Sequence, residues 1–86
     1  MAAPHAPAPG TVVVYATTWC PYCHRLRLGL QEAGIEHDVV DVDTDPAAAR
    51  YVESVNGGNR VVPTVLFADG TTLTNPAVEQ VAARLA

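Results

Sequence analysis

The feature that most limits the possible folds is a Cys-x-x-Cys motif, CPYC at residues 20–23, placed between a strand signal and a helix signal. Residues 11–16 read TVVVYA, a short β-branched apolar run that predicts a buried central strand. From Pro21 onward the apolar residues recur at spacings of three and four, which predicts a helix that ends at Gly34. The motif therefore marks a strand-to-helix junction, and the remaining chain must complete a sheet around the first strand.

The rest of the chain alternates strand and helix signals. Four further elements are predicted from apolar patterning: a strand at residues 36–42, a helix at 46–55, a strand at 61–67 and a strand at 71–73. Asp45 and Asn75 are each followed by proline, and this cap-plus-proline pattern predicts the starts of the second and third helices. The Asp69-Gly70 pair is a strong hairpin signal that joins the last two strands.

This element order, βαβαββα, predicts the fold class. Strands joined through helices pair in parallel with right-handed crossovers, whereas a tight turn requires an antiparallel pair. We therefore expect an α/β fold with a four-stranded mixed sheet flanked by three helices. The 86 residues allow a single domain, which we place at residues 11–86, after a flexible Ala- and Pro-rich tail at residues 1–10.

The charge balance argues against several kinds of partner. Nine acidic residues stand against five basic ones, all of them arginine, and the net charge is -4. An acidic chain without a basic run is a poor binder of nucleic acid or anionic membranes, and no apolar stretch approaches the roughly 18 residues of a membrane span. The first ten residues lack the charged and apolar regions of an export signal, so we expect a cytoplasmic protein. In that reducing compartment, paired cysteines are typical of catalysis or metal binding.

The chemistry expected at the motif follows from its position at a helix start. Cys20 lies where unpaired backbone N–H groups and the positive end of the helix dipole favour an anion, which makes it the candidate nucleophile. Cys23 lies one turn inside the helix, close enough to attack a mixed disulfide formed on Cys20, which makes it the candidate resolving thiol. Pro21 has no N–H to lose in the first turn. The motif therefore predicts thiol–disulfide exchange.

A zinc site is the main alternative for the two cysteines. Zinc requires four ligands, and His24 and His37 are the candidates to complete the set. His24 directly follows Cys23, which is too close for a normal chelate loop, and His37 lies on a predicted strand of unknown facing. We therefore expect no metal, and an inert pair of buried thiols is the remaining alternative.

Three motifs in the chain resemble the glutaredoxin branch of the thioredoxin-fold family: WCPYC at residues 19–23, RVVPTV at 60–65 and the Asp69-Gly70 turn. The resemblance covers residues 12–85 and implies a thioredoxin/glutaredoxin fold with thiol–disulfide oxidoreductase activity. It also implies that Pro63 is cis and faces the catalytic cysteine. The backbone of Val62 would then be free to pair with a disulfide substrate.

The thiol-binding side of the site departs from the glutathione-binding members of that branch. A lysine usually lies three residues before the first cysteine, where this chain has Thr17. An acidic residue that contacts the glutathione amine is replaced by apolar residues in the 73–78 segment. The runs at residues 54–60 and 74–76 instead resemble the mycoredoxins, which use the sugar-inositol thiol mycothiol.

The mycoredoxin resemblance implies a set of partners and binding residues. Mycothiol would be the co-substrate, with no bound cofactor, and S-mycothiolated or disulfide-bearing proteins would be the clients. Mycothiol disulfide reductase would recycle the thiol. The substrate-binding residues implied are Trp19, Tyr22, Arg60, Val62, Pro63, Thr74 and Asn75. We expect the protein to act as a monomer.

Two further functions remain open. An electron donor resembling the NrdH-redoxins, reduced directly by a flavoprotein thioredoxin reductase, would share the motif. Such members carry Trp-Ser-Gly-Phe where this chain reads LTNP at residues 73–76. An iron–sulfur cluster scaffold would bridge two chains through Cys20, although Pro21 stiffens the approach to that cysteine.

Overall fold

A computed structural model describes residues 6–86 of the chain. Its elements are β1 Val12–Ala16, α1 Pro21–Glu32, β2 His37–Asp41, α2 Pro46–Val55, β3 Thr64–Leu66, β4 Thr72–Thr74 and α3 Val78–Leu85. The predicted βαβαββα order is therefore confirmed. None of these helices is long and apolar enough to cross a membrane. Residues 1–5 of the predicted tail lie outside the described part, and the flexibility of the tail stays a prediction.

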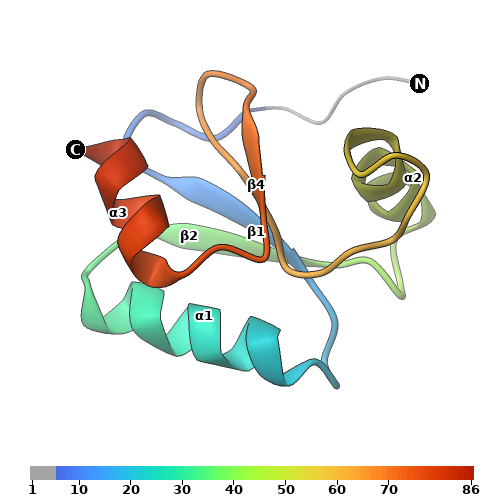
Figure 1. The fold of residues 1–86 in the computed structure, drawn as a ribbon, viewed down its shortest axis with the longest axis horizontal. Coiled ribbons are helices and arrows are strands. Elements are labelled where there is room, and N and C mark those ends of the chain that lie inside the picture. Colours follow the sequence, from blue (N-terminus) through green and yellow to red (C-terminus); the bar gives the residue numbers. More distant parts are fainter. Residues whose placement is uncertain (1–5) are drawn as a thin grey trace.

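The four strands form one mixed sheet in the order β2-β1-β3-β4 (Figure 1). β1 runs parallel to β2, with Val14 opposite Val39, and antiparallel to β3, with Val14 opposite Val65. β3 pairs antiparallel with β4, with Val65 opposite Leu73. β1 therefore lies in the interior of the sheet, as its apolar sequence predicts, and Val14 is fully buried.

Helices cover both faces of the sheet (Figure 1). α1 and α3 pack on one face, where Leu30 and Val81 join Val14 in a core cluster that also contains both cysteines. α2 packs on the other face, where Val52 and Tyr15 belong to a second cluster. Successive residues of β1 thus serve opposite cores, because side chains alternate along a strand. The CPYC motif, at the start of α1, belongs to the first of these cores.

Two helix termini follow the predicted local signals. α1 ends before Gly34, which has a φ of 70° and donates its N–H to the Gln31 carbonyl at 3.1 Å. This pattern closes a helix C-terminus and requires a residue that tolerates positive φ. α2 begins after Asp45, whose Oδ1 accepts the Ala48 N–H at 3.1 Å. The cap predicted at Asp45 is therefore confirmed.

The predicted start of the third helix is wrong. Asn75 does not cap α3, because it adopts a left-handed conformation with a φ of 48° and donates its N–H to the Pro63 carbonyl at 2.7 Å. α3 begins at Val78, after Ala77, whose N–H donates to Gln80 Oε1 at 2.7 Å. Asparagine suits both a helix cap and a left-handed turn, so the local pattern did not separate the two.

The third strand is shorter than predicted. β3 begins at Thr64 rather than at Val61. The Val61 N–H donates to the Asn59 carbonyl at 3.1 Å, which keeps this stretch in a turn, and Pro63 has no N–H to offer a strand neighbour. The Val62–Pro63 peptide bond is cis, as the family resemblance implies.

A hydrogen-bond network centred on Asn56 ties the end of α2 to the sheet. Its Nδ2 donates to the Val52 carbonyl at 2.9 Å and to the Thr64 hydroxyl at 3.2 Å. Its Oδ1 accepts the Thr74 hydroxyl at 2.6 Å. Thr64 is fully buried in β3, and Thr74 ends β4. One side chain therefore fixes α2 against two strands.

Replacing Asn56 is expected to destabilise the protein. Asn56→Ala should lower the free energy of unfolding by about 1 to 3 kcal/mol, because it removes three hydrogen bonds, to the Val52 carbonyl, the buried Thr64 hydroxyl and the Thr74 hydroxyl. Urea unfolding should show a lower midpoint with an unchanged slope. Asn59→Ala is the matched control, since it removes one exposed hydrogen bond, from Nδ2 to the Asn56 carbonyl. Equal midpoints for the two variants would show that the network contributes nothing.

Candidate active site

The two cysteines of the CPYC motif lie together at the start of α1. Cys20 is the N-cap, in an extended backbone conformation, and its sulfur accepts the Cys23 N–H at 3.4 Å. An amide donor at a helix N-terminus stabilises a thiolate. Cys20 is 4% exposed and Cys23 is 1% exposed, so Cys20 is the more accessible of the two free thiols. The arrangement supplies what the predicted nucleophile needs, and its role stays a prediction.

The buried position of Cys23 sets its protonation state. Burial raises the pKa of the Cys23 thiol to about 11, with desolvation as the largest cause. The nearby Cys20 sulfur, which accepts the Cys23 backbone N–H, raises this pKa as well. The Thr17 N–H and the positive charge of Arg27 act in the opposite direction. At neutral pH Cys23 is therefore a thiol that can donate to Cys20.

Two exposed aromatic residues border the motif. Trp19 is 69% exposed, and its indole N–H donates to Asp43 Oδ2, between β2 and α2, at 2.9 Å. Tyr22 is 56% exposed, and the Arg25 guanidinium carbon lies 5.9 Å from the centre of its ring. Neither residue caps the core, so both rings are available to contact a substrate.

The Val62–Pro63 segment borders both core clusters. Pro63 is buried, and Val62 packs against the cluster that contains Cys20 and Cys23. Within residues 6–86, no backbone hydrogen bond uses the Val62 amide or carbonyl. The Asn75 N–H donates to the Pro63 carbonyl at 2.7 Å, and this hydrogen bond ties the Val62–Pro63 segment to the residue that follows β4. The Val62 backbone is therefore free to pair with an extended substrate.

The remaining predicted binding residues have partners inside the protein. The Thr74 hydroxyl donates to Asn56. The Arg60 side chain forms an ion pair with Glu53. Its Nε donates to Glu53 Oε2 at 3.3 Å, and its Nη2 lies 3.2 Å from the same oxygen. The Arg60 side chain remains half-exposed. The structure thus directs Arg60 toward the end of α2. Thr17, at the position of the missing lysine, is buried rather than exposed.

A groove of about 630 Å³ opens beside the motif, between α1 and the start of α3. Tyr22 and Leu28 line it on α1, and residues 75–79 line it on the other side. The two walls approach closely because Gly29 has no side chain, and a Cβ there would lie 3.0 Å from Val78 Cβ. The groove reaches the motif only through Tyr22, and neither cysteine lines it.

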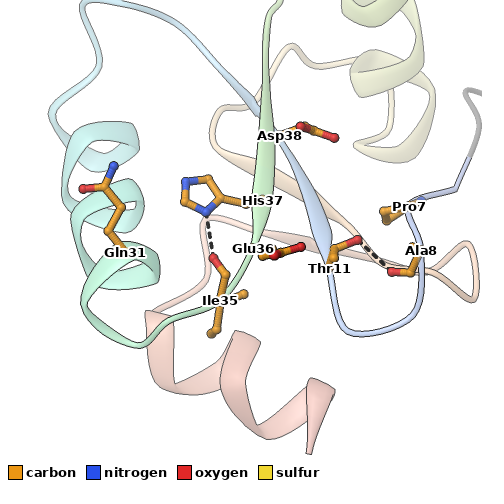
Figure 2. Close-up of a pocket in the computed structure, with 8 residues that line it drawn as sticks. All are labelled: Pro7, Ala8, Thr11, Gln31, Ile35, Glu36, His37 and Asp38. Atoms are coloured by element: carbon orange, nitrogen blue, oxygen red, sulfur yellow. Dashed lines mark hydrogen bonds between the residues drawn. The ribbon is translucent and has the colours of Figure 1, made fainter.

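A second hollow, of about 600 Å³, lies at the opposite end of α1 from the motif (Figure 2). His37 turns toward Gln31 of α1, with Nδ1 2.9 Å from the Ile35 carbonyl, whereas Glu36 and Asp38 point to the other side of β2. Across residues 6–86, no group of three or more His, Cys, Asp or Glu side chains is arranged to hold a metal ion. The zinc alternative therefore finds no ligand set in this part of the chain.

Comparison with known proteins reveals close relatives. A protein-family model described as Glutaredoxin matches residues 12–72. A Mycobacterium tuberculosis relative named as a glutaredoxin is 54% identical over 74 residues, which cover 86% of this chain and 88% of the relative. Mycoredoxin 1 of Corynebacterium glutamicum is 53% identical over 74 residues, which cover 86% of this chain and 91% of that protein.

A solved structure shows the same architecture. The glutaredoxin from Methanosarcina mazei Go1 superposes with a TM-score of 0.77 at 22% identity, over 91% of this chain and 80% of that chain. This likeness establishes the thioredoxin/glutaredoxin fold. Because the family model spans most of the chain and two relatives share more than half of its aligned residues, the chain belongs to the glutaredoxin family of thiol–disulfide oxidoreductases.

Proposed function

We propose that the protein reduces mixed disulfides between mycothiol and client proteins. The observation that carries this proposal is the Cys20 sulfur at the start of α1, which accepts the Cys23 N–H beside an exposed aromatic border. The similarity to Mycoredoxin 1 of Corynebacterium glutamicum, over 91% of that protein, supports mycothiol as the thiol. We place the reaction in the cytoplasm, where protein disulfides are mostly transient and catalytic.

The reaction is a sequence of thiol–disulfide exchanges. The Cys20 thiolate attacks the mycothiol sulfur of the mixed disulfide, a bond between Cys20 and mycothiol forms, and the client thiolate leaves and takes up a proton. A second mycothiol then attacks the mycothiol sulfur of this adduct, which releases the Cys20 thiolate and mycothiol disulfide. Mycothiol disulfide reductase recycles that product. On the dithiol route Cys23 attacks Cys20 instead, forms the internal disulfide and releases mycothiol.

The surface next to the motif supports a thiol rich in hydroxyl groups. Thr17 is uncharged and buried, so the position where glutathione-binding members have a lysine carries no exposed cation. The exposed Asn75 offers a side-chain amide. The Thr74 hydroxyl donates to Asn56, and its lone pairs remain free to accept from a sugar hydroxyl. Mycothiol presents hydroxyls of this kind and lacks the free amine of glutathione.

The groups around Cys20 suit a bound disulfide. The free Val62 backbone would pair with the peptide-like part of the thiol or of the client. Trp19 and Tyr22 would supply apolar contact area on either side, as exposed rings commonly do at binding surfaces. Arg60, which is half-exposed beside Glu53, would reach a polar group at the far end of the thiol.

The choice of thiol is tested by parallel coupled assays. One arm reduces a mycothiol mixed disulfide with mycothiol and mycothiol disulfide reductase, and the other uses glutathione with its own mixed disulfide and reductase. We expect kcat/KM to be about tenfold to a hundredfold higher with mycothiol, because the glutathione ammonium loses a charged hydrogen bond worth about 1.5 to 3 kcal/mol.

The outcomes of this assay separate the alternatives. Equal or faster turnover with glutathione would remove the mycothiol assignment and leave the oxidoreductase class intact. Direct reduction by NADPH and a flavoprotein thioredoxin reductase, without any small thiol, would instead identify an NrdH-like donor. A visible absorbance band that requires Cys20 would indicate an iron–sulfur scaffold.

A further inference from the structure

The two carbonyls that flank Val62 are both held by donors inside the protein. The Thr64 hydroxyl donates to the Val61 carbonyl at 2.8 Å. The Asn75 N–H donates to the Pro63 carbonyl at 2.7 Å. Val62 itself is only partly buried, and within residues 6–86 its amide and carbonyl take part in no backbone hydrogen bond. The chain is thus fixed on both sides of one residue whose own backbone groups remain free.

Asn56 determines where the Thr64 hydroxyl points. The Val52 carbonyl can only accept a hydrogen bond, so the Asn56 Nδ2 group is the one that faces it, at 2.9 Å. The same Nδ2 donates to the Thr64 oxygen at 3.2 Å. A hydroxyl has a single hydrogen, and because Asn56 is a donor to Thr64, that hydrogen is directed to the Val61 carbonyl. Thr64 is fully buried, so solvent does not compete for this hydrogen bond.

Asn56 also anchors the segment that carries Asn75. The Asn56 Oδ1 accepts the Thr74 hydroxyl at 2.6 Å. Thr74 is the last residue of β4, and Asn75 follows it with a φ of 48°. Because the Asn75 N–H belongs to the peptide bond that follows Thr74, this contact steadies the donor that holds the Pro63 carbonyl. Both restraints on the Val62 backbone therefore lead back to one side chain.

We propose that Asn56 is a positioning residue that presents the Val62 backbone to a disulfide substrate. Asn56 is the C-cap of α2, and its side-chain hydrogen bonds involve neither cysteine. It therefore acts through Thr64 and Thr74 rather than on the reacting sulfurs. The proposal rests on the substrate pairing at Val62 proposed above, but it does not depend on which small thiol the protein uses.

The benefit of this network is that the Val62 segment is ordered before the substrate binds. A fixed segment loses no conformational freedom when an extended peptide pairs with it, whereas a loose one does. In Asn56→Ala the Thr64 hydroxyl is free to turn away from the Val61 carbonyl, and Thr74 loses its acceptor. Ordering the backbone of one residue corresponds to about a tenfold change in an equilibrium constant.

The test compares two substrates of the Cys23→Ser protein. The first is a mixed disulfide between a peptide cysteine and a coloured aromatic thiol. Cys20 attacks the peptide sulfur and bonds to it, and the aromatic thiolate leaves because it has the lower pKa. The second is the symmetrical aromatic disulfide, which has no peptide group to pair with Val62. Each reaction releases one coloured thiolate, so the ratio of the two rate constants measures peptide pairing and does not depend on the folded fraction.

We expect Asn56→Ala to lower this ratio about tenfold, because the peptide substrate reacts more slowly and the aromatic one does not. Thr64→Val keeps the shape of the side chain without its hydroxyl, should lower the ratio severalfold, and replaces Asn56→Ala if that variant does not fold. Thr64→Ser keeps the hydroxyl and should retain the ratio. Val12→Ala removes a fully buried side chain at the opposite end of β1 from the motif. It is the destabilised control and should also retain the ratio.

Amide hydrogen exchange locates the effect at Val62. In the peptide adduct trapped on Cys20, the Val62 N–H should exchange more slowly than in the free protein, because it is paired with the peptide. Asn56→Ala should lower this protection about tenfold, whereas Val12→Ala should leave it unchanged. A purely structural role of Asn56 would change neither the substrate ratio nor the protection of this one amide.

The proposal is overturned if the substrate ratio and the Val62 protection in folded Asn56→Ala and Thr64→Val equal those of the Cys23→Ser parent. An unprotected Val62 amide in the parent adduct would overturn the pairing at Val62 and this role of Asn56 together. Because neither test substrate contains mycothiol, a failed mycothiol assignment leaves these outcomes unaffected.

Discussion

Cys20→Ser is expected to reduce turnover to the uncatalysed background, whereas Cys23→Ser is expected to retain turnover through a second thiol. The chain has two cysteines, and Cys20 is the more accessible one and accepts an N–H at the start of α1. Serine is also a good N-cap residue, so the loss in Cys20→Ser reports on chemistry rather than on unfolding. The coupled mixed-disulfide assay measures the rates. Intact-mass spectra of Cys23→Ser should show the thiol adduct trapped on Cys20.

A further comparison tests whether a side-chain donor at position 23 helps the Cys20 nucleophile. Cys23→Ser keeps a donor beside Cys20, and Cys23→Ala removes it. The ratio of their rates therefore measures how much a neutral donor at this position helps the nucleophile. An active Cys20→Ser variant and an inactive Cys23→Ser variant would assign the first attack to the buried sulfur instead.

The rate of internal disulfide closure is expected to rise about a hundredfold between pH 7 and pH 9, because the thiolate fraction of Cys23 grows about tenfold per pH unit below its pKa. Burial, the largest cause, keeps that pKa above its ordinary value of 9.0 while Cys20 is held in the mixed disulfide, so this range lies below the pKa. Closure is measured by stopped flow with an aromatic disulfide, because attack by Cys20 releases one coloured thiolate and closure by Cys23 releases the second. The first release in the same trace is the internal reference. A closure rate that is level over this range would show that Cys23 is already ionised at pH 7.

The raised pKa of Cys23 also fixes the sign of its effect on stability. The folded chain holds this proton more tightly than a thiol with the ordinary pKa of 9.0. The contribution of Cys23 to folding is therefore complete below pH 9 and is lost as the pH rises toward 11. The oxidised protein has no Cys23 proton to lose. Melting curves of the two forms at alkaline pH thus serve as the control for the kinetic profile.

The element order could be predicted from the sequence because each signal is local. β1 reads as a continuous apolar run, and α1 shows the three- and four-residue spacing of a helix. Asp45 caps α2 through Ala48, which lies three residues away. Asn75 shows where local reasoning fails, because its left-handed conformation goes with a hydrogen bond to Pro63, which is distant in sequence.

The candidate site also combines features that local sequence signals predict with contacts between residues distant in sequence, which they do not. The spacing of the two cysteines and the family resemblance led to the motif and to the cis bond before Pro63. The Trp19–Asp43 hydrogen bond joins residues 24 positions apart, and no spacing rule predicts such a pair. In the sequence Thr17 indicates only that a lysine is missing. The burial of its side chain becomes visible only when the strands and helices pack together.

The interior position of β1 sets the order in which the site matures during protein synthesis. β1 and both cysteines leave the ribosome before β2, α2, the adjoining Pro63 and the antiparallel partner β3. A domain folds as a unit once such long-range pairings can form. The nascent chain therefore carries its thiols before it has the backbone segment that we propose to pair with their substrates. Redox competence therefore arrives only after β3 and Pro63 have been synthesised.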